Sequence, residues 1–181
     1  AIYSGKHDEL KKCLDVLNVN TKYKDSTLLH TSVTANKTEC IRVLLDAGAD
    51  PIIRNENTNT FPLVSACGRK NKTQINMLIS KGASLNQRIE RGWDPRPPET
   101  PFTRAVTSSS STPKFIKYLI EKGGNVNMID QSPLSMSIMN RNLEIADVLI
   151  DAGADLNAFS PLTAACCIGD ISLINKIIAG G

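Results

Sequence analysis

The pentapeptide Asp46-Ala47-Gly48-Ala49-Asp50 recurs without change at residues 151–155 of this 181-residue chain. Shorter variants of the same motif lie between the two copies, at residues 81–84 and 122–125. Each copy follows a pair of large apolar residues, such as Leu44-Leu45. A repeat period of roughly 20 to 50 residues is typical of repeat architectures. The sequence therefore predicts a chain built by repetition of one small unit.

A second motif precedes the copies of the first and predicts where helices begin. In three of its copies a Ser or Thr is followed by Pro, as in Thr100-Pro101. The hydroxyl group can cap free backbone N–H groups, and proline is well suited to the first helical turn because it has no N–H. The copies lie at residues 27–30, 61–64, 100–103, 132–135 and 160–163.

Together the two motifs define a unit of helix, turn, helix and loop. Polar residues or glycine interrupt each first helix, and apolar residues then recur at helical spacing, as in Ile41, Leu44 and Leu45. The glycine that follows supplies the left-handed conformation that commonly ends a helix. We expect these leucines to be buried: Leu29, Leu44, Leu63, Leu78, Leu119, Leu134, Leu149 and Leu162.

The unit resembles the ankyrin repeat, which has a T-P-L-H-x-A signature. Residues 27–32 are the nearest copy of that signature, residues 48–50 resemble the family's G-A-D, and residues 125–127 and 155–157 resemble its repeat-ending D-V-N. The resemblance covers essentially the whole chain and implies an all-α ankyrin-repeat solenoid, whose stacked helix-turn-helix units are joined by β-hairpin-like loops. In such a fold His30 would hydrogen-bond neighbouring turns rather than act in catalysis.

We predict a single array over residues 1–181 with one continuous core. The expected parts are a partial unit at 1–20, units at about 21–54, 55–87, 94–127, 128–156 and 157–181, and an insertion at about 88–99. A second insertion, Ser108 to Thr112, lengthens one turn between paired helices, and phosphorylation of its serines is the alternative to a plain flexible turn. The partial unit lacks its beginning, so we expect the chain to be a piece of a longer protein.

Composition excludes several classes of partner. The chain has 21 Lys and Arg against 18 Asp and Glu, a net charge of only +3, which does not point to nucleic acid. No apolar run approaches the roughly 18 to 20 residues that a membrane-spanning helix needs. The residues point to no partner other than protein, and we expect the isolated domain to be a monomer.

The five cysteines point to a reducing compartment because their number is odd and they form no C-x-x-C motif. We therefore predict a cytoplasmic location, with the nucleus as the alternative. We interpret the cysteines, including the adjacent Cys166 and Cys167, as small packing residues rather than zinc ligands or reactive thiols.

Nothing in the sequence resembles a catalytic centre or a cofactor site. The two histidines, His7 and His30, have no nucleophile beside them in any known motif, and phosphate-binding glycine loops are absent. We predict that the chain is not an enzyme and needs no cofactor.

The resemblance implies a protein-binding module, scaffold or adaptor that binds on a concave surface formed by loop tips and first helices. Residues 51–110 hold nine basic and four acidic side chains, so the positive excess is central and favours an acidic or phosphorylated partner segment. The loop tips also include Asn55, and the first helices also include Thr34 and Ala35. The predicted contact residues are Tyr23, Arg69, Arg88, Arg91, Trp93, Arg96, Met128, Asn140 and Phe159.

Two alternative functions stay open: a structural spacer within a larger multidomain protein, and the host-binding domain of a pathogen effector. The family resemblance also suggests a modification. Asn127 lies in a setting in which ankyrin-repeat asparagines are β-hydroxylated by an iron- and 2-oxoglutarate-dependent enzyme in animal cells. The competing interpretation is that the Asn127 amide hydrogen-bonds the hairpin turn.

Overall fold

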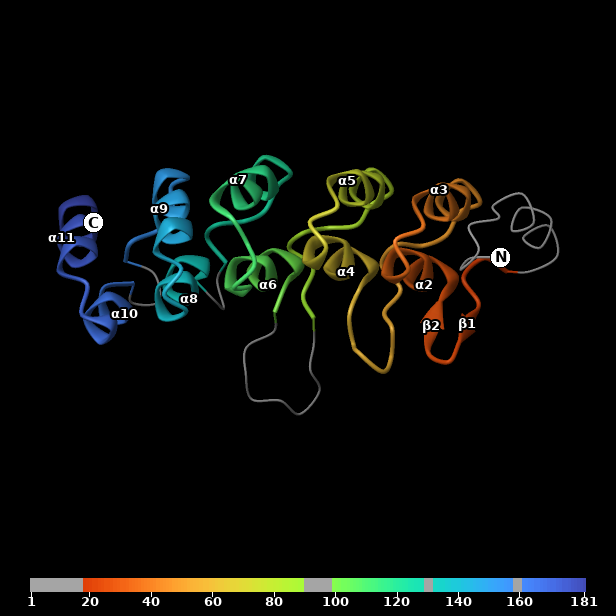
Figure 1. Ribbon diagram of the computed structural model, residues 1–181, viewed down its shortest axis with the longest axis horizontal. Helices are drawn as coiled ribbons and strands as arrows, with labels where there is room; N and C mark the ends of the chain where they lie inside the picture. The colour runs from red at the N-terminus through yellow and green to blue at the C-terminus, as the bar shows by residue number, and fades with distance from the viewer. Residues whose placement is uncertain (1–17, 90–98, 129–131, 158–160) are drawn as a thin grey trace. The chain divides into compact units, whose positions relative to one another are not determined.

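The computed structural model describes residues 18–89, 99–128, 132–157 and 161–181. The chain divides into two compact units, residues 1–92 and residues 93–181, which we term unit 1 and unit 2. Each unit is made of pairs of short helices joined by loops (Figure 1).

Unit 1 begins, within the described residues, with a two-stranded antiparallel hairpin in which Lys22 pairs with Thr27. Lys24 and Asp25 form its turn with positive φ angles of 48° and 63°. Two helix pairs follow. The elements of unit 1 are β1 (Lys22–Tyr23), β2 (Ser26–Thr27), α2 (Leu28–Thr34), α3 (Thr38–Asp46), α4 (Pro62–Gly68) and α5 (Lys72–Ser80).

Unit 2 contains three helix pairs in its described residues. A longer turn, residues 108–112, separates the helices of its first pair, as the serine insertion predicts. The elements are α6 (Pro101–Thr107), α7 (Pro113–Glu121), α8 (Pro133–Met139), α9 (Leu143–Asp151), α10 (Pro161–Ile168) and α11 (Ile171–Gly180).

Hydroxyl caps begin the first helices where the sequence predicts them. The Thr27 side chain accepts a hydrogen bond from the backbone N–H of His30, and Ser132 caps α8 in the same way through Ser135. Thr100 and Thr103 form a complete capping box at the start of α6. The helix α4 has no side-chain cap and begins with Pro62 alone.

The second helices end at glycines in the left-handed conformation. Gly48 has φ of 85° and Gly153 has φ of 82°. In both places the next residue, alanine, returns its backbone N–H to the carbonyl of a core leucine at 2.9 Å. These bonds satisfy carbonyl groups that the end of a helix would otherwise leave free.

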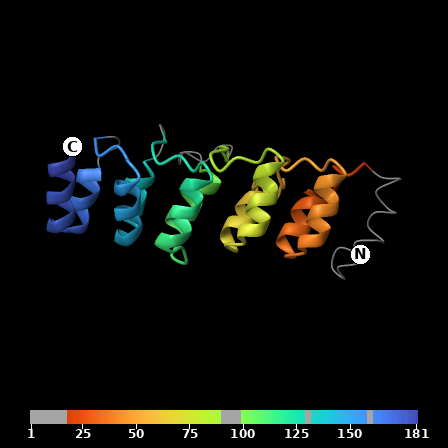
Figure 2. The ribbon, with the colours of Figure 1, turned by 90° about the horizontal axis from the view of Figure 1, so that it is seen from above.

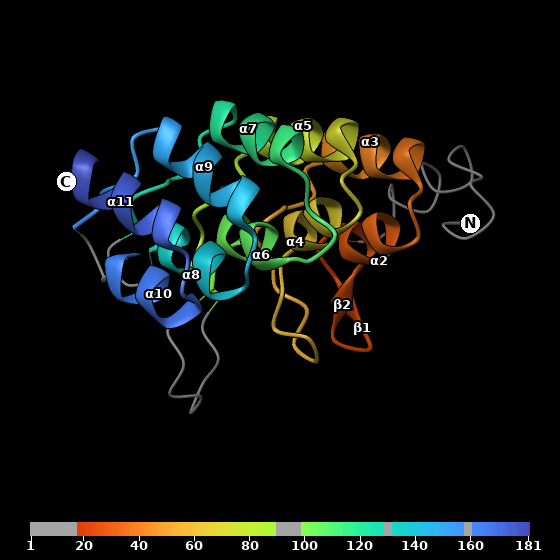
Figure 3. The ribbon, with the colours of Figure 1, turned by 60° about the vertical axis from the view of Figure 1, so that its left-hand side comes forward.

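Within each unit the helices stack in two rows. In unit 1, α2 contacts α4 and α3 contacts α5; in unit 2, α8 lies between α6 and α10, and α7 contacts α9. Figures 1 and 3 show the first helices of each unit in one row and the second helices in the other, and Figure 2 shows the same helices from above. The cores lie between the rows, and seven of the eight predicted leucines are buried there: Leu29, Leu44, Leu63, Leu78, Leu119, Leu134 and Leu149.

The prediction that Leu162 is buried is wrong, because its exposed fraction is 38%. The interpretation of Cys166 and Cys167 as packing residues is also wrong, since both side chains are exposed. Leu134 and Ile138 hold the same positions in α8 as Leu162 and Cys166 hold in α10, and both are buried in α8, on which α10 packs. Within the described residues no further helix pair packs on the equivalent face of α10.

Candidate functional site

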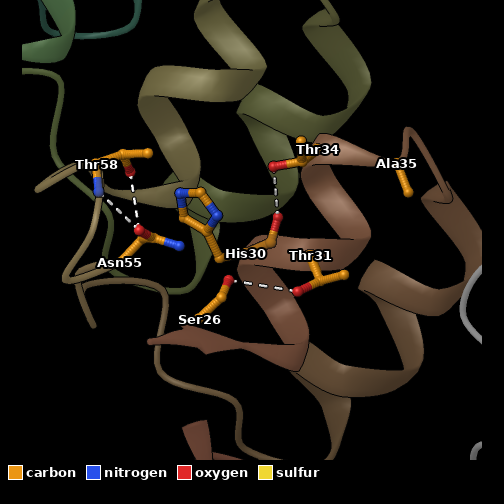
Figure 4. A pocket seen from close by; sticks show the side chains of 7 residues that line it. All are labelled: Ser26, His30, Thr31, Thr34, Ala35, Asn55 and Thr58. Carbon is orange, nitrogen blue, oxygen red and sulfur yellow. Dashed lines mark hydrogen bonds between the residues drawn. The ribbon is translucent and has the colours of Figure 1, made fainter. Parts of the chain in front are cut away.

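Unit 1 carries a groove of about 330 Å³ between α2, the β2 strand and the loop that precedes α4. Its wall on the helix side is formed by residues of α2 and by the residue that ends this helix, and its other wall by the loop around residue 55 (Figure 4). We term it the α2 groove; its lining residues are Ser26, His30, Thr31, Thr34, Ala35, Asn55 and Thr58.

Local hydrogen bonds hold the loop wall of the α2 groove in place. The Asn55 side-chain carbonyl accepts bonds from the backbone N–H of Thr58 at 2.9 Å and from the Thr58 hydroxyl at 3.1 Å. The Asn55 N–H pairs with the carbonyl of Thr60, and the Glu56 N–H donates to the carbonyl of Asp25 in the β1–β2 turn. The loop is therefore tied both to itself and to the neighbouring hairpin.

The α2 groove has no formal charge on its lining. His30 is the titratable member, with an exposed fraction of 6%, and burial lowers its pKa from the usual 6.5. The imidazole is therefore neutral at physiological pH. Nearby, Lys22 forms an ion pair with Glu56, and its hydrogen bond lowers the pKa of that exposed carboxyl.

Three of the predicted contact residues are described in unit 1. Tyr23 is 72% exposed beside the hairpin turn, with the Lys24 ammonium 5.5 Å from the centre of its ring. The exposed Arg69 donates through its guanidinium to the carbonyl of Thr34, the last residue of α2, and thus stands at one end of the α2 groove. Arg88 is exposed and precedes Ile89, which is buried against Phe61 and Val64.

Two more predicted contact residues are described in unit 2. Met128 is half-buried, and the exposed Asn140 donates through its amide to the Met136 carbonyl at 2.7 Å, so α8 engages that donor. The remaining predicted contact residues lie outside the described part of the chain: Arg91, Trp93, Arg96 and Phe159.

The Asn127 side chain bridges neighbouring turns of unit 2. Its amide nitrogen donates to the Gly153 carbonyl at 3.0 Å, and its carbonyl accepts the Asp155 N–H at 2.7 Å. These bonds match the structural interpretation that the sequence sets against hydroxylation. Hydroxylation of Asn127 stays a prediction; mass spectrometry of the protein expressed in animal cells tests it, and an unmodified Asn127 peptide would contradict it.

Part of the α2 groove could be predicted from the sequence. Thr34, Ala35 and Asn55 are among the predicted concave-surface positions, whereas Ser26, Thr31 and Thr58 are not. The available signal was the run of small hydroxyl residues at 26, 27, 31 and 34, which is too common on exposed helices to single out a groove.

A second hollow of about 400 Å³ lies in unit 2, at the turns between the paired helices. Its lining residues are Arg141, Leu143, Ile168, Gly169, Asp170 and Ile171. Within residues 18–89, 99–128, 132–157 and 161–181, His, Cys, Asp and Glu side chains form no cluster that could hold a metal ion. None of the helices in these ranges has the length and apolar character required to cross a membrane.

Family models for ankyrin repeats match residues 1–89 and 130–158, which together make up more than half of the chain. The chain belongs to the ankyrin-repeat family. Ankyrin repeats are non-catalytic protein–protein interaction modules. The family assignment agrees with the T-P-L-H-like motif and the paired helices.

Two viral ankyrin repeat proteins are among its relatives. One from Acanthamoeba polyphaga mimivirus is 30% identical over 76% of this chain and 38% of its own length. One from fowlpox virus is 31% identical over 74% of this chain and 29% of its own length. The chain thus spans less than two fifths of the length of these relatives.

Solved ankyrin-repeat structures share the fold. The ankyrin repeat domain of Bcl-3 matches the whole chain with a TM-score of 0.82 at 22% identity and is covered over 84% of its length. The domain of human ASB11 matches with a TM-score of 0.73 at 20% identity and is covered over 81%.

Proposed function

We propose that this ankyrin-repeat chain is an adaptor module that binds a segment of a partner protein in the α2 groove. The observation that carries the proposal is the groove itself, about 330 Å³ in volume, with one wall built on a helix and the other on a loop fixed by hydrogen bonds. Rigid walls favour binding because little conformational entropy is lost when a ligand docks.

A steric block tests this proposal. Ala35 lines the α2 groove at the end of α2, and Ala47 ends α3 in nearly the same backbone conformation, with φ of −79° and −80°. Ala47 does not line the groove. The matched variants Ala35→Trp and Ala47→Trp therefore add the same bulk inside and outside the groove.

Peptides selected from a phage-displayed random library on the wild-type chain are the probe. We expect Ala35→Trp to weaken their binding by about tenfold or more and Ala47→Trp to leave it unchanged. Thermal melts of both variants check that the fold is intact. Peptides that bind both variants equally would reject the α2 groove as the binding site. If the chain is a structural spacer, no selected peptide should lose binding in Ala35→Trp alone.

The proposal extends to the partner's charge. An acidic or phosphorylated segment is supported by the nine basic and four acidic residues between 51 and 110 and by the exposed Arg69 and Arg88. The predicted set includes Arg91 and Arg96, with Trp93 as an apolar anchor. We expect Arg88→Glu with Arg91→Glu mainly to slow association and to flatten its salt dependence.

Replacement of the Trp93 anchor should change the dissociation rate rather than the association rate. We expect Trp93→Ala to raise the dissociation rate and to cost about 2 kcal/mol or more of binding free energy. A partner that binds the Trp93 and arginine variants as well as the wild type would move the site away from residues 88–96. The proposal also includes that the isolated domain is a monomer and that the protein is located in the cytoplasm or nucleus.

A further inference from the structure

The hydroxyl groups on the helix side of the α2 groove have already used their hydrogens. The Thr31 hydroxyl donates to the Thr27 carbonyl at 3.1 Å, and the Thr34 hydroxyl donates to the His30 carbonyl at 2.9 Å (Figure 4 draws the second bond). A threonine hydroxyl has one hydrogen and two lone pairs. While these two bonds are kept, both oxygens offer a ligand lone pairs.

The hydroxyl hydrogen of Ser26 is also engaged within the protein. Its Oγ lies 3.3 Å from Thr31 Oγ1 and 3.4 Å from the Thr27 carbonyl oxygen. Because the Thr31 hydrogen is directed to Thr27, the hydrogen between the two hydroxyl groups comes from Ser26. This side of the groove thus presents three hydrogen-bond acceptors, the hydroxyl oxygens of Ser26, Thr31 and Thr34.

The opposite wall presents a donor. Asn55 Oδ1 accepts the Thr58 backbone N–H, and a flipped amide would set Nδ2 against that N–H, so the orientation of the amide is determined. Its Nδ2 is turned toward the side of the groove where His30 lies (Figure 4). Within the part of the chain that the structure describes, no acceptor pairs with this nitrogen.

This arrangement selects against charged ligand groups. A phosphate or carboxylate would face the lone pairs of three hydroxyl oxygens, with no basic side chain on the lining. An ammonium or guanidinium group would find no carboxylate on the lining and would leave the Asn55 donor without an acceptor. An uncharged group that carries both a donor and an acceptor satisfies both walls, because the hydroxyl oxygens and the Asn55 donor then each find a partner.

We propose that the α2 groove binds the carboxamide side chain of a glutamine or asparagine in the partner segment. The carboxamide NH₂ donates to the hydroxyl oxygens of Thr31 and Thr34, and its carbonyl accepts from Asn55 Nδ2. This inference rests on the proposed function and names the partner chemistry of the same groove. The acidic character proposed for the partner belongs to its contacts with Arg69, Arg88, Arg91 and Arg96 rather than with the groove lining.

Chemical-shift titration of the ¹⁵N-labelled chain tests the inference with three probes: N-acetyl-glutamine amide, N-acetyl-glutamate amide and N-acetyl-lysine amide. We expect the glutamine probe to shift the resonances of Thr31, Thr34 and the Asn55 side-chain NH₂. At equal concentration these shifts should exceed those of the charged probes by about threefold or more.

Two matched threonines supply the control. Thr34 and Thr107 both end a first helix and both donate to the carbonyl four residues earlier. Thr34→Val should reduce the response to the glutamine probe by about threefold or more, whereas Thr107→Val should leave it unchanged. Asn55→Asp should shift the preference toward the lysine probe, because it replaces the free donor with an anionic acceptor.

Equal responses to the three probes, no response, or a response that survives Thr34→Val would overturn the carboxamide assignment. None of these results would affect the proposed function, which is decided separately by the peptides that Ala35→Trp excludes. Loss of peptide binding in Ala35→Trp without any carboxamide preference would therefore keep the groove as the site and reject only its chemistry.

Discussion

Gly124 and Phe102 replace a pair of residues that three other described repeats keep as alanine and leucine. A Cβ atom added to Gly124 would lie 2.5 Å from Cδ2 and 2.7 Å from Cε2 of Phe102, far inside normal contact. The corresponding alanines are Ala49, Ala83 and Ala154, and the corresponding leucines of the same repeats are Leu29, Leu63 and Leu134. The larger ring in this repeat therefore requires the smaller residue.

We expect Gly124→Ala to lower the free energy of unfolding by about 1–3 kcal/mol through overpacking. Adding Phe102→Leu should recover part of that loss, so the two changes should be strongly non-additive in a double-mutant cycle measured by urea unfolding. Additive effects would mean that Gly124 and Phe102 do not constrain each other.

His30 should make the stability of the chain depend on pH. Burial lowers the pKa of His30 in the folded state below the usual 6.5, so below that pH the unfolded chain binds more protons. The free energy of unfolding should therefore fall as the pH drops from 7.5 toward 5.5, above the range where carboxylates titrate. In urea unfolding across this range His30→Gln should flatten the slope. Equal slopes in wild type and His30→Gln would contradict the argument.

At the scale of the element, the same leucine position has different energetic weight in α8 and α10. Leu134 is fully buried in α8, on which α10 packs, whereas Leu162 is 38% exposed. We expect Leu134→Ala to cost about 2–5 kcal/mol in denaturant unfolding and Leu162→Ala to cost about 1 kcal/mol or less. Equal losses would show that the outer face of α10 is covered in solution.

The described cysteines differ in burial according to the helix that carries them, and we expect their reactivity to differ accordingly. Cys40 in α3 and Cys67 in α4 are buried, and burial raises the pKa of both thiols, that of Cys67 to about 12. Cys166 and Cys167 in α10 are exposed. In a Cys13→Ser background we expect a disulfide reagent to label the α10 pair rapidly and the buried pair only after denaturation. Rapid labelling of four thiols in the native state would contradict this burial.

At the scale of the whole molecule, an asparagine in the loop before a helix pair is tied to the loop after that pair in both units. The Asn20 side chain accepts the Asp50 N–H at 2.8 Å in unit 1, and Asn127 accepts the Asp155 N–H at 2.7 Å in unit 2. Ile52 occupies the equivalent position in another repeat, where Ser84 is the equivalent of Asp50. The backbone is already suitable, because the Ile52 N–H donates to Asp50 Oδ1 as the Asn127 N–H donates to Asn125 Oδ1.

We therefore expect Ile52→Asn to add a hydrogen bond to the Ser84 N–H and to raise the free energy of unfolding by about 0.5–1.5 kcal/mol. Ile52 is 45% exposed, so little apolar burial is lost by the change. Ile52→Ala, which removes the same side chain without supplying an amide, is the control. If the two variants unfold at the same denaturant concentration, the missing bond does not limit stability.

The repeat, the helix starts and the helix ends could be predicted from the sequence because each depends on residues a few positions apart. A Thr27 or Ser132 hydroxyl reaches an N–H three residues ahead, and Gly48 or Gly153 needs only its own backbone freedom to end a helix. The buried leucines of the inner repeats follow from the same helical spacing.

Only the tertiary structure decided the exposure of α10 and the chemistry of the α2 groove. Leu162 and Cys166 have the spacing of core residues, and the presence of a neighbouring helix pair, which spacing does not encode, determines whether they are buried. Likewise, the groove exists because the loop that carries Asn55 lies opposite α2. The hydroxyl hydrogens of Thr31 and Thr34 are directed to carbonyl groups that the folded helix places beside them. The local sequence determines which groups are present, but packing between distant segments determines which of their donors and acceptors stay free.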